Sequence, residues 1–121
     1  MAVFLGEINE ATTGRYTATL YDETGAVIDG AALTTLTLTL YDVATNAVIN
    51  SRSSQNVLNE NGVAVTSDGT LTWTIAKEDT VIVGRRLRER HAALFVGTWA
   101  SGVKKFTHQI EMDVVNLVKV V

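Results

Sequence analysis

Apolar and polar side chains alternate strictly over residues 36–41, in the order Leu-Thr-Leu-Thr-Leu-Tyr. Successive side chains of a β-strand point to opposite faces, so the leucines share one face and the threonines and tyrosine share the other. An α-helix has a period near 3.6 residues and cannot gather this pattern into one stripe. The same alternation returns at residues 71–75 and 106–114. The pattern therefore predicts a β-sheet protein whose strands each bury one face.

Further short strands are expected where turn residues separate apolar segments. Asn61-Gly62 is a strong hairpin signal, and the triplet Ala100-Ser101-Gly102 predicts another turn. Residues 76–90 are expected to connect two strands, in part as a short helix. The other expected strands are 15–22, 26–28, 47–49, 63–65 and 91–99, with a loop at 50–60. Turns at intervals of about 8 to 12 residues are typical of a sandwich, so we expect an all-β fold, an antiparallel immunoglobulin-like β-sandwich of about seven or more strands.

The length and composition are those of one domain without disulfide cross-links. The chain has 121 residues, no cysteine and a formal net charge of −3. This length supports a hydrophobic core, and the lack of cysteine excludes disulfides and thiolate metal sites. We expect a sandwich domain at 15–116, an N-terminal arm or edge strand at 1–14, and an apolar C-terminal tail or edge strand at 117–121. No apolar run approaches the ~20 residues of a membrane helix, and the apolar start is too short for a signal peptide, so we expect no membrane association.

Candidate catalytic and metal-binding residues are few. His108 alternates with Phe106 and Ile110 on the drier strand face, and we expect a hydrogen-bonded histidine at the sheet margin. Glu89 and His91 share a face if their strand extends that far, but zinc needs three or four converging ligands. The serines lie in expected loops, and none sits in a Gly-x-Ser-x-Gly motif. We therefore predict no catalytic residue, no metal site and no cofactor.

The only basic cluster is Arg-Arg-Leu-Arg-Glu-Arg at 85–90. It is short and carries no interleaved aromatic side chain, so we favour an exposed loop or a salt-bridging patch in an assembly over nucleic-acid binding. Trp73 alternates with leucine and isoleucine and is expected in the core. Trp99 ends a strand beside a turn, where it is a weak candidate for a contact residue.

Both ends of the chain are apolar and prone to β-structure, so in water they need shelter. They are either edge strands of the chain's own sandwich or segments that dock on a neighbouring subunit by strand addition. The strand at 91–99 is apolar on both faces, which indicates that both are covered. The predicted interface combines the apolar ends with three arginines and one tryptophan: Val3, Phe4, Leu5, Arg85, Arg86, Arg88, Trp99, Leu117, Val118 and Val120.

Five segments carry a resemblance to a known class of proteins: Arg-Tyr-Thr-Ala-Thr-Leu at 15–20, residues 36–42, Asn-Val-Leu-Asn at 56–59 with Asn61-Gly62, Leu-Thr-Trp at 71–73, and His-Ala-Ala-Leu-Phe at 91–95. Their order resembles small β-sandwich structural proteins of tailed-phage virions, of the capsid decoration (cement) or head-to-tail type. The basic run at 85–90 departs from the more acidic connection expected there.

The resemblance implies a non-enzymatic virion protein, made in the host cytoplasm and present in many copies. Its most favoured role is capsid decoration, in which it binds the outer capsid surface and bridges neighbouring capsomers. The implied partners are the major capsid protein or neighbouring virion subunits, with a homo-oligomer in the particle and no nucleic acid or membrane. The alternatives are a neck or tail component of the virion, a carbohydrate- or receptor-binding module that uses Trp99, and, least favoured, an enzyme.

Overall fold

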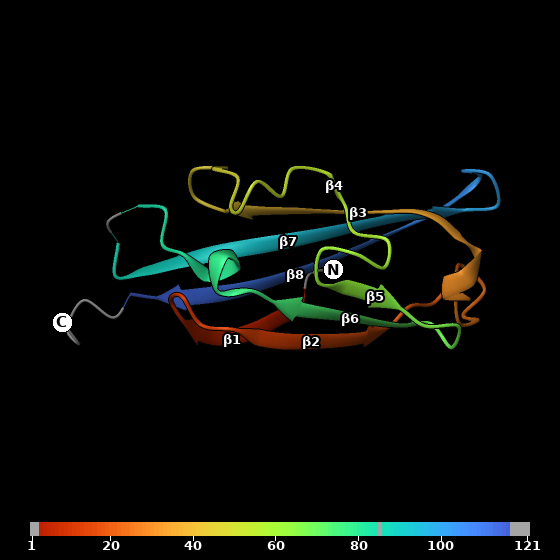
Figure 1. Cartoon of the computed structure of the whole chain (residues 1–121), viewed down its shortest axis with the longest axis horizontal. Coiled ribbons are helices and arrows are strands. Elements are labelled where there is room, and N and C mark those ends of the chain that lie inside the picture. The colour runs from red at the N-terminus through yellow and green to blue at the C-terminus, as the bar shows by residue number, and fades with distance from the viewer. Residues whose placement is uncertain (1–2, 85, 117–121) are drawn as a thin grey trace.

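The computed structural model describes residues 3–84 and 86–116, and within them eight strands form two sheets packed face to face (Figure 1). The larger sheet has the order β1-β8-β7-β3-β4, and the smaller has the order β2-β6-β5. The expected all-β sandwich is therefore confirmed. The strands are β1 (Val3–Asn9), β2 (Gly14–Thr19), β3 (Leu33–Asp42), β4 (Gln55–Asn56), β5 (Val63–Val65), β6 (Thr70–Ile75), β7 (Arg88–Trp99) and β8 (Lys104–Val115).

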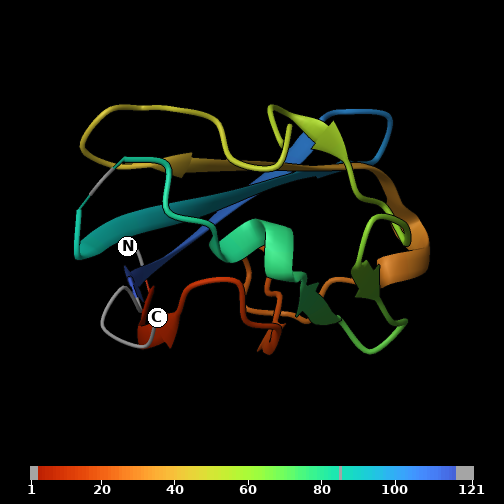
Figure 2. The same ribbon diagram turned by 60° about the vertical axis from the view of Figure 1, so that its left-hand side comes forward.

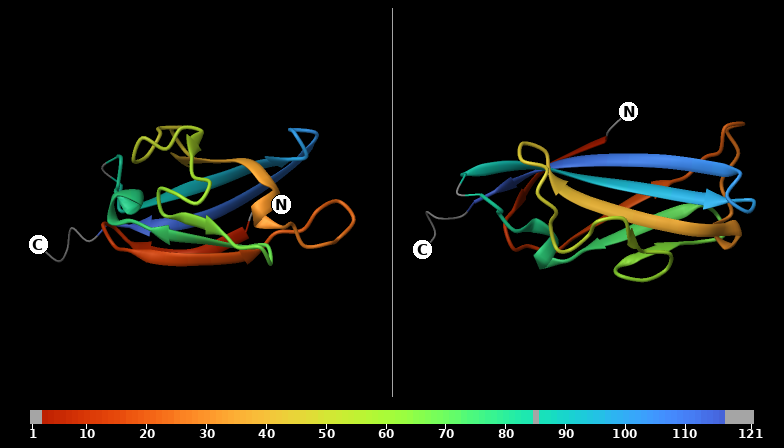
Figure 3. Two further views of the ribbon diagram at one scale, coloured as in Figure 1. Left: turned by 45° about the vertical axis from the view of Figure 1, so that its right-hand side comes forward. Right: turned by 90° about the horizontal axis from the view of Figure 1, so that it is seen from above.

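The hairpin of β7 and β8 forms the central pair of long strands in the larger sheet. Each of these strands has 12 residues, and the hairpin runs along the length of the sandwich (Figure 3). β3 pairs with β7 in antiparallel register, and β1 adds to the far side of β8. The β1–β8 pair is parallel, with Val3 beside Ile110 and Ile8 beside Val114, so the expectation of a purely antiparallel sandwich is wrong at this edge. Nothing in the local sequence of β1 specifies the direction of a partner that lies at the other end of the chain.

The core lies between the sheets and follows the alternation of the strands. Leu36, Leu38 and Leu40 of β3 are fully buried, as their shared strand face predicts. Trp73 of β6 is also buried, and its ring meets the ring of Phe95 edge-on at a centroid distance of 5.7 Å. The core assignment of Trp73 is thus confirmed. Each fully buried side chain of this size contributes about 1.5–3 kcal/mol to the hydrophobic driving force.

Some local predictions differ from the structure. Residues 47–49 do not form a strand, and only an isolated bridge links Val48 to Tyr41. Residues 26–28 do not form a strand, and only an isolated bridge links Val27 to Tyr21. The reason is the Asp22 carboxylate, which accepts hydrogen bonds from the backbone N–H groups of Thr24 and Ala26. These bonds hold the segment in a turn, so its backbone does not form the hydrogen-bond ladder of a strand pair. The expected loop at 50–60 contains the two-residue strand β4, which pairs with β3.

The connection at 76–90 contains a single 3₁₀ turn, η2 (Lys77–Thr80), which lies between the two layers (Figure 2). The other 3₁₀ turn, η1 (Gly30–Ala32), precedes β3 and is capped by the Asp29 carboxylate. The β-branched residues at 81–83 stay outside the sheets, and β7 begins at Arg88, earlier than the expected start at residue 91. The early start places Glu89 within the strand, on the same inward face as His91.

The two faces of β7 differ in how they are covered. Ala93 and Phe95 on the inner face are buried against the smaller sheet. On the outer face Ala92 is buried, whereas Leu94 and Val96 are half-buried between neighbouring strands. The expectation that both faces are covered therefore holds fully only for the inner face.

Candidate functional site

The predicted apolar interface near the N-terminus lies on β1, the outermost strand of the larger sheet. Val3, Phe4 and Leu5 are exposed, Phe4 by 52% of its surface. Among the described strands β1 pairs only with β8, so its other edge carries backbone groups without a sheet partner. A register shift between Phe4 and Glu7, with Gly6 at φ +94°, bends the strand. Such a bulge restricts which strands can add to this edge.

A hollow of about 180 Å³ lies beside β1, toward β2. Its apolar lining comes from Leu5 and Ile8 of β1, Ile75 of β6 and Met112 of β8, and Glu7 and Arg15 also contribute to its lining. A hollow of this size and lining accommodates one apolar side chain of a neighbouring molecule.

Two arginines lie next to this edge. Arg88 forms ion pairs with Glu7 and with Asp113, and Arg90 pairs with Asp113 at 2.9 Å. The guanidinium of Arg90 also lies over the Phe4 ring, 4.7 Å from its centroid. The hydrogen bonds from Arg90 and Arg88 hold the pKa of the Asp113 carboxyl below its usual range. We call this the edge surface, and it consists of Val3, Phe4, Leu5, Glu7, Arg88, Arg90 and Asp113.

The other predicted interface residues do not join the edge surface. Trp99 is half-buried and lies at the opposite end of β7 from Arg88. The centroid of its ring is 6.2 Å from the centroid of the Phe106 ring. Arg86 turns inward toward two buried carboxylates. Arg85, Leu117, Val118 and Val120 lie outside the described residues. Sequence reasoning also missed Arg90, because its contact with Phe4 depends on the parallel pairing of β1 with β8.

His108 connects the two sheets. Its Nε2 lies 2.6 Å from the hydroxyl oxygen of Tyr16 on β2, and the two rings are stacked. Burial lowers the pKa of His108 and raises the pKa of Tyr16. The expectation of a hydrogen-bonded histidine is confirmed.

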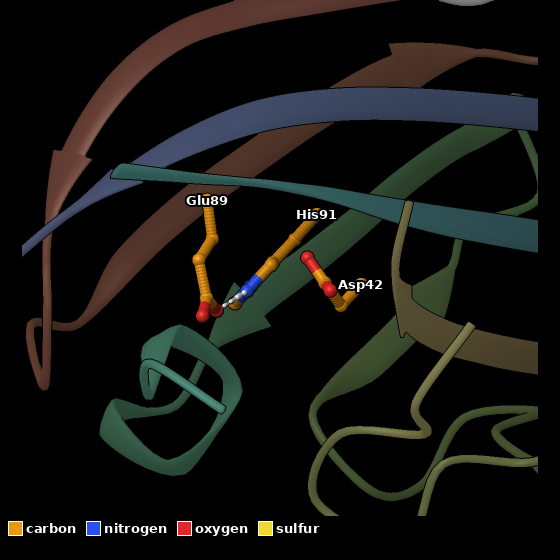
Figure 4. A group of neighbouring side chains, drawn as sticks. All are labelled: Asp42, Glu89 and His91. Carbon is orange, nitrogen blue, oxygen red and sulfur yellow. Dashed lines mark hydrogen bonds and ion pairs between the residues drawn. The ribbon is translucent and has the colours of Figure 1, made fainter. Parts of the chain in front are cut away.

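A second polar cluster lies at the end of the core, where Asp42 of β3 meets Glu89 and His91 of β7 (Figure 4). All three residues are buried, and each offers one potential ligand atom within 4.8 Å of the others. Asp42 is the residue that sequence reasoning missed. The signal was available, because Asp42 shares the strand parity of Leu38 and Leu40 and so must point into the core.

Hydrogen bonds surround one side of this cluster. The Glu89 carboxylate accepts from the backbone N–H groups of Val83 and Gly84 and lies 2.9 Å from Nε2 of His91. Burial alone would raise the pKa of Glu89, but these hydrogen bonds outweigh burial and lower its pKa. For Asp42 burial likewise acts to raise the pKa, and the hydrogen bonds to its Oδ2 from Thr45 and Arg86 lower it. Both carboxylates are therefore ionised at neutral pH.

The other side of the cluster is unsatisfied. Oδ1 of Asp42 and Nδ1 of His91 are buried and have no hydrogen-bond partner among the described residues. An ionised carboxylate can only accept, so Nε2 of His91 carries the proton that Glu89 accepts. In the neutral imidazole Nδ1 then has a free lone pair. Two buried polar atoms without a hydrogen-bond partner are costly, because each has lost its hydrogen bonds to water.

A third polar centre joins Arg52 to Asp79 of η2, and both side chains are buried. Asp79 Oδ1 accepts from Arg52 Nε at 2.7 Å and from Asn50 Nδ2 at 2.8 Å, and Oδ2 accepts from Arg52 and from the backbone of Ala76. Arg52 also donates to Gln55 and contributes to the lining of a polar hollow of about 440 Å³. This centre ties the loop after β3 to η2.

The chain matches no protein-family model, no curated protein and no solved structure. In the described part of the chain no helix is long and apolar enough to cross a bilayer.

Proposed function

We propose that this chain is a non-enzymatic structural protein of a phage virion, most specifically a capsid decoration protein that binds the outer capsid surface and bridges neighbouring capsomers. The observation that carries the proposal is the edge surface, where an outermost strand exposes three consecutive apolar side chains. The virion context comes from the order of strand segments that resembles phage structural proteins.

The edge surface has the parts that strand addition requires. The free edge of β1 offers backbone hydrogen bonds to an extended segment of a partner, and the hollow beside it takes one apolar side chain. Burial of Val3, Phe4 and Leu5 stabilises the contact by about 25 cal/mol per Å² of apolar surface removed from water. Each contact is modest, but many copies on one shell act together.

The charged part of the edge surface favours a protein partner over nucleic acid. Arg88 and Arg90 each pair with carboxylates of this chain, so their charge is largely compensated. A phosphate backbone would have to compete with Glu7 and Asp113 for them. The proposed partners are thus the major capsid protein or neighbouring virion subunits, including further copies of this chain, after synthesis in the host cytoplasm.

The copy number in purified virions tests the proposal directly. Quantitative mass spectrometry of particles, with the major capsid protein as internal reference, should find one or a few copies of this chain per capsomer. The copy number of a single ring would favour the alternative role as a neck or tail component. Absence of the chain from the particles would contradict both roles.

The edge surface itself is tested with a matched pair of variants. Phe4→Glu introduces a charge where the apolar contact is proposed, and Val103→Glu makes the same change at the hairpin tip, where Val103 is 81% exposed. In a sedimentation assay with particles that lack the protein, we expect Phe4→Glu to weaken binding about tenfold or more and Val103→Glu to leave it unchanged. Circular dichroism checks that both variants fold. Equal binding by wild type and Phe4→Glu would rule out this edge as the contact.

A further inference from the structure

The cluster at the end of the core has the donor arrangement of a metal site. Figure 4 shows the imidazole of His91 between the carboxylates of Glu89 and Asp42. Nδ1 of His91 and Oδ1 of Asp42 have no hydrogen-bond partner among the described residues, and with Nε2 donating to Glu89 a neutral imidazole keeps the lone pair of Nδ1 for a ligand. A histidine that ligates a metal commonly donates its other ring N–H to a carboxylate, which orients the ring and raises its basicity. Glu89 stands in that position.

The charges of the cluster also favour a cation. Two buried carboxyl groups, those of Asp42 and Glu89, share one guanidinium, that of Arg86, so the cluster offers more acidic than basic groups. All three cluster residues are buried, and an uncompensated charge in such a place is expensive. A bound divalent cation would compensate the carboxylates and satisfy both unpartnered atoms.

We propose that Asp42 and His91 ligate one divalent transition-metal ion of the zinc class, with Glu89 as the carboxylate that orients His91. A nitrogen donor beside carboxylate oxygens suits zinc, cobalt or manganese better than calcium or magnesium, which take oxygen ligands. Two ligands about 2.1 Å from zinc are at most about 4.2 Å apart, and Asp42, Glu89 and His91 each have a potential ligand atom within 4.8 Å of the others, so the side chains are close enough to converge on one ion after rotation. Water completes the coordination.

Arg86 controls this site as a competing cation. Its side chain is 37% exposed, and its guanidinium contacts both Asp42 and Glu89. A metal ion that approaches from the solvent must displace it or share the carboxylates with it. Removal of the Arg86 charge should therefore strengthen metal binding, which is the opposite of what a purely structural role of the cluster predicts.

The test uses the full chain without a histidine tag, stripped with a chelator and titrated with Co²⁺, whose visible absorption reports coordination by protein ligands. We expect one ion per chain, displaced by Zn²⁺. His91→Gln and Asp42→Asn should abolish the signal, and Arg86→Gln should bind about tenfold more tightly or better. His108→Gln is the matched control, because it removes the other histidine, which hydrogen-bonds Tyr16, and it should bind as the wild type does.

A measurement on the wild type keeps the test decisive if a variant fails to fold. In ¹⁵N NMR of the imidazoles, Zn²⁺ should shift Nδ1 of His91 and leave His108 in place. The proposal is overturned if the wild type takes up no stoichiometric ion at millimolar metal, if His91→Gln binds as the wild type does, or if Zn²⁺ shifts His108 instead. A crystal of metal-soaked protein in which a water molecule bridges the two unpartnered atoms would overturn it as well.

Discussion

Two buried aspartates in this fold differ in how completely their carboxylate oxygens are hydrogen-bonded. Asp79 and Asp42 are both fully buried and both pair with an arginine. Both oxygens of Asp79 accept hydrogen bonds, and its partner Arg52 is buried with it. Asp42 keeps one oxygen unpartnered and shares the half-exposed Arg86 with Glu89. Equal burial therefore does not imply an equal role.

The difference separates a structural ion pair from a possible binding site. We call the pair of Arg52 and Asp79 the clamp, and the second centre, at Asp42, has polar atoms that a ligand can still use. At Asp79 both carboxylate oxygens and the guanidinium of Arg52 are hydrogen-bonded within the chain, so a ligand would have to break contacts that the fold already supplies. At Asp42 the fold leaves lone pairs unused and places a replaceable cation on the solvent side. The first centre should matter most for stability, and the second should respond to what is added to the solution.

The largest effect is expected when the clamp loses one partner. Arg52→Met leaves the Asp79 carboxylate buried without its cation and should lower the free energy of unfolding by about 3–5 kcal/mol. Urea denaturation followed by tryptophan fluorescence measures the change. The double variant Arg52→Met with Asp79→Leu removes both charges and should recover part of the loss. A cost below about 1 kcal/mol for the single variant would show that the pair is not a clamp.

A smaller effect is expected at the second centre. Asp42→Asn keeps the shape of the side chain but removes its charge, and one of its oxygens already lacks a partner. Without metal, the free energy of unfolding should fall by about 1–3 kcal/mol. The same urea assay in the presence of a chelator makes the comparison. If this variant costs as much as Arg52→Met, the contrast between the two centres is wrong.

The smallest effect on stability is expected at His108. This residue lies outside both centres, so its pH dependence serves as a reference for them. Its pKa is lowered by burial, so the unfolded chain binds the proton more readily than the folded chain does. The contribution of His108 is therefore fully present above the unfolded pKa of about 6.5 and declines as the pH falls through the lower folded value. Thermal unfolding between neutral and mildly acidic pH should show this decline, and His108→Gln should flatten it. An unchanged profile in the variant would assign the decline to other groups.

Local patterns in the sequence predicted much of the fold. The alternation at 36–41 and 71–75 gave strands β3 and β6 with the correct inward faces, and Trp73 was correctly placed in the core. The turn at Ala100-Ser101-Gly102 was found from its residue types. These features depend on neighbours in the chain, so one sequence suffices to find them.

Features that depend on distant partners were missed. The parallel pairing of β1 with β8 joins the two ends of the chain, and only the assembled sheet places Phe4 under Arg90. The cluster of Asp42 with Glu89 and His91 was hidden for a related reason. The expected strand began at residue 91, which left Glu89 outside it, and the alternation was followed only to residue 41, although the parity of Asp42 points inward.

The tip of the β7–β8 hairpin has a practical consequence. The turn between the strands holds Ala100, Ser101 and Gly102 at positive φ, and the next residue, Val103, is almost fully exposed. Short exposed turns of this kind tolerate inserted peptides. An epitope or a dye-binding tag placed there, at the opposite end of β7 from both Arg88 and His91, would let the protein be followed in cells without touching the edge surface or the cluster around His91.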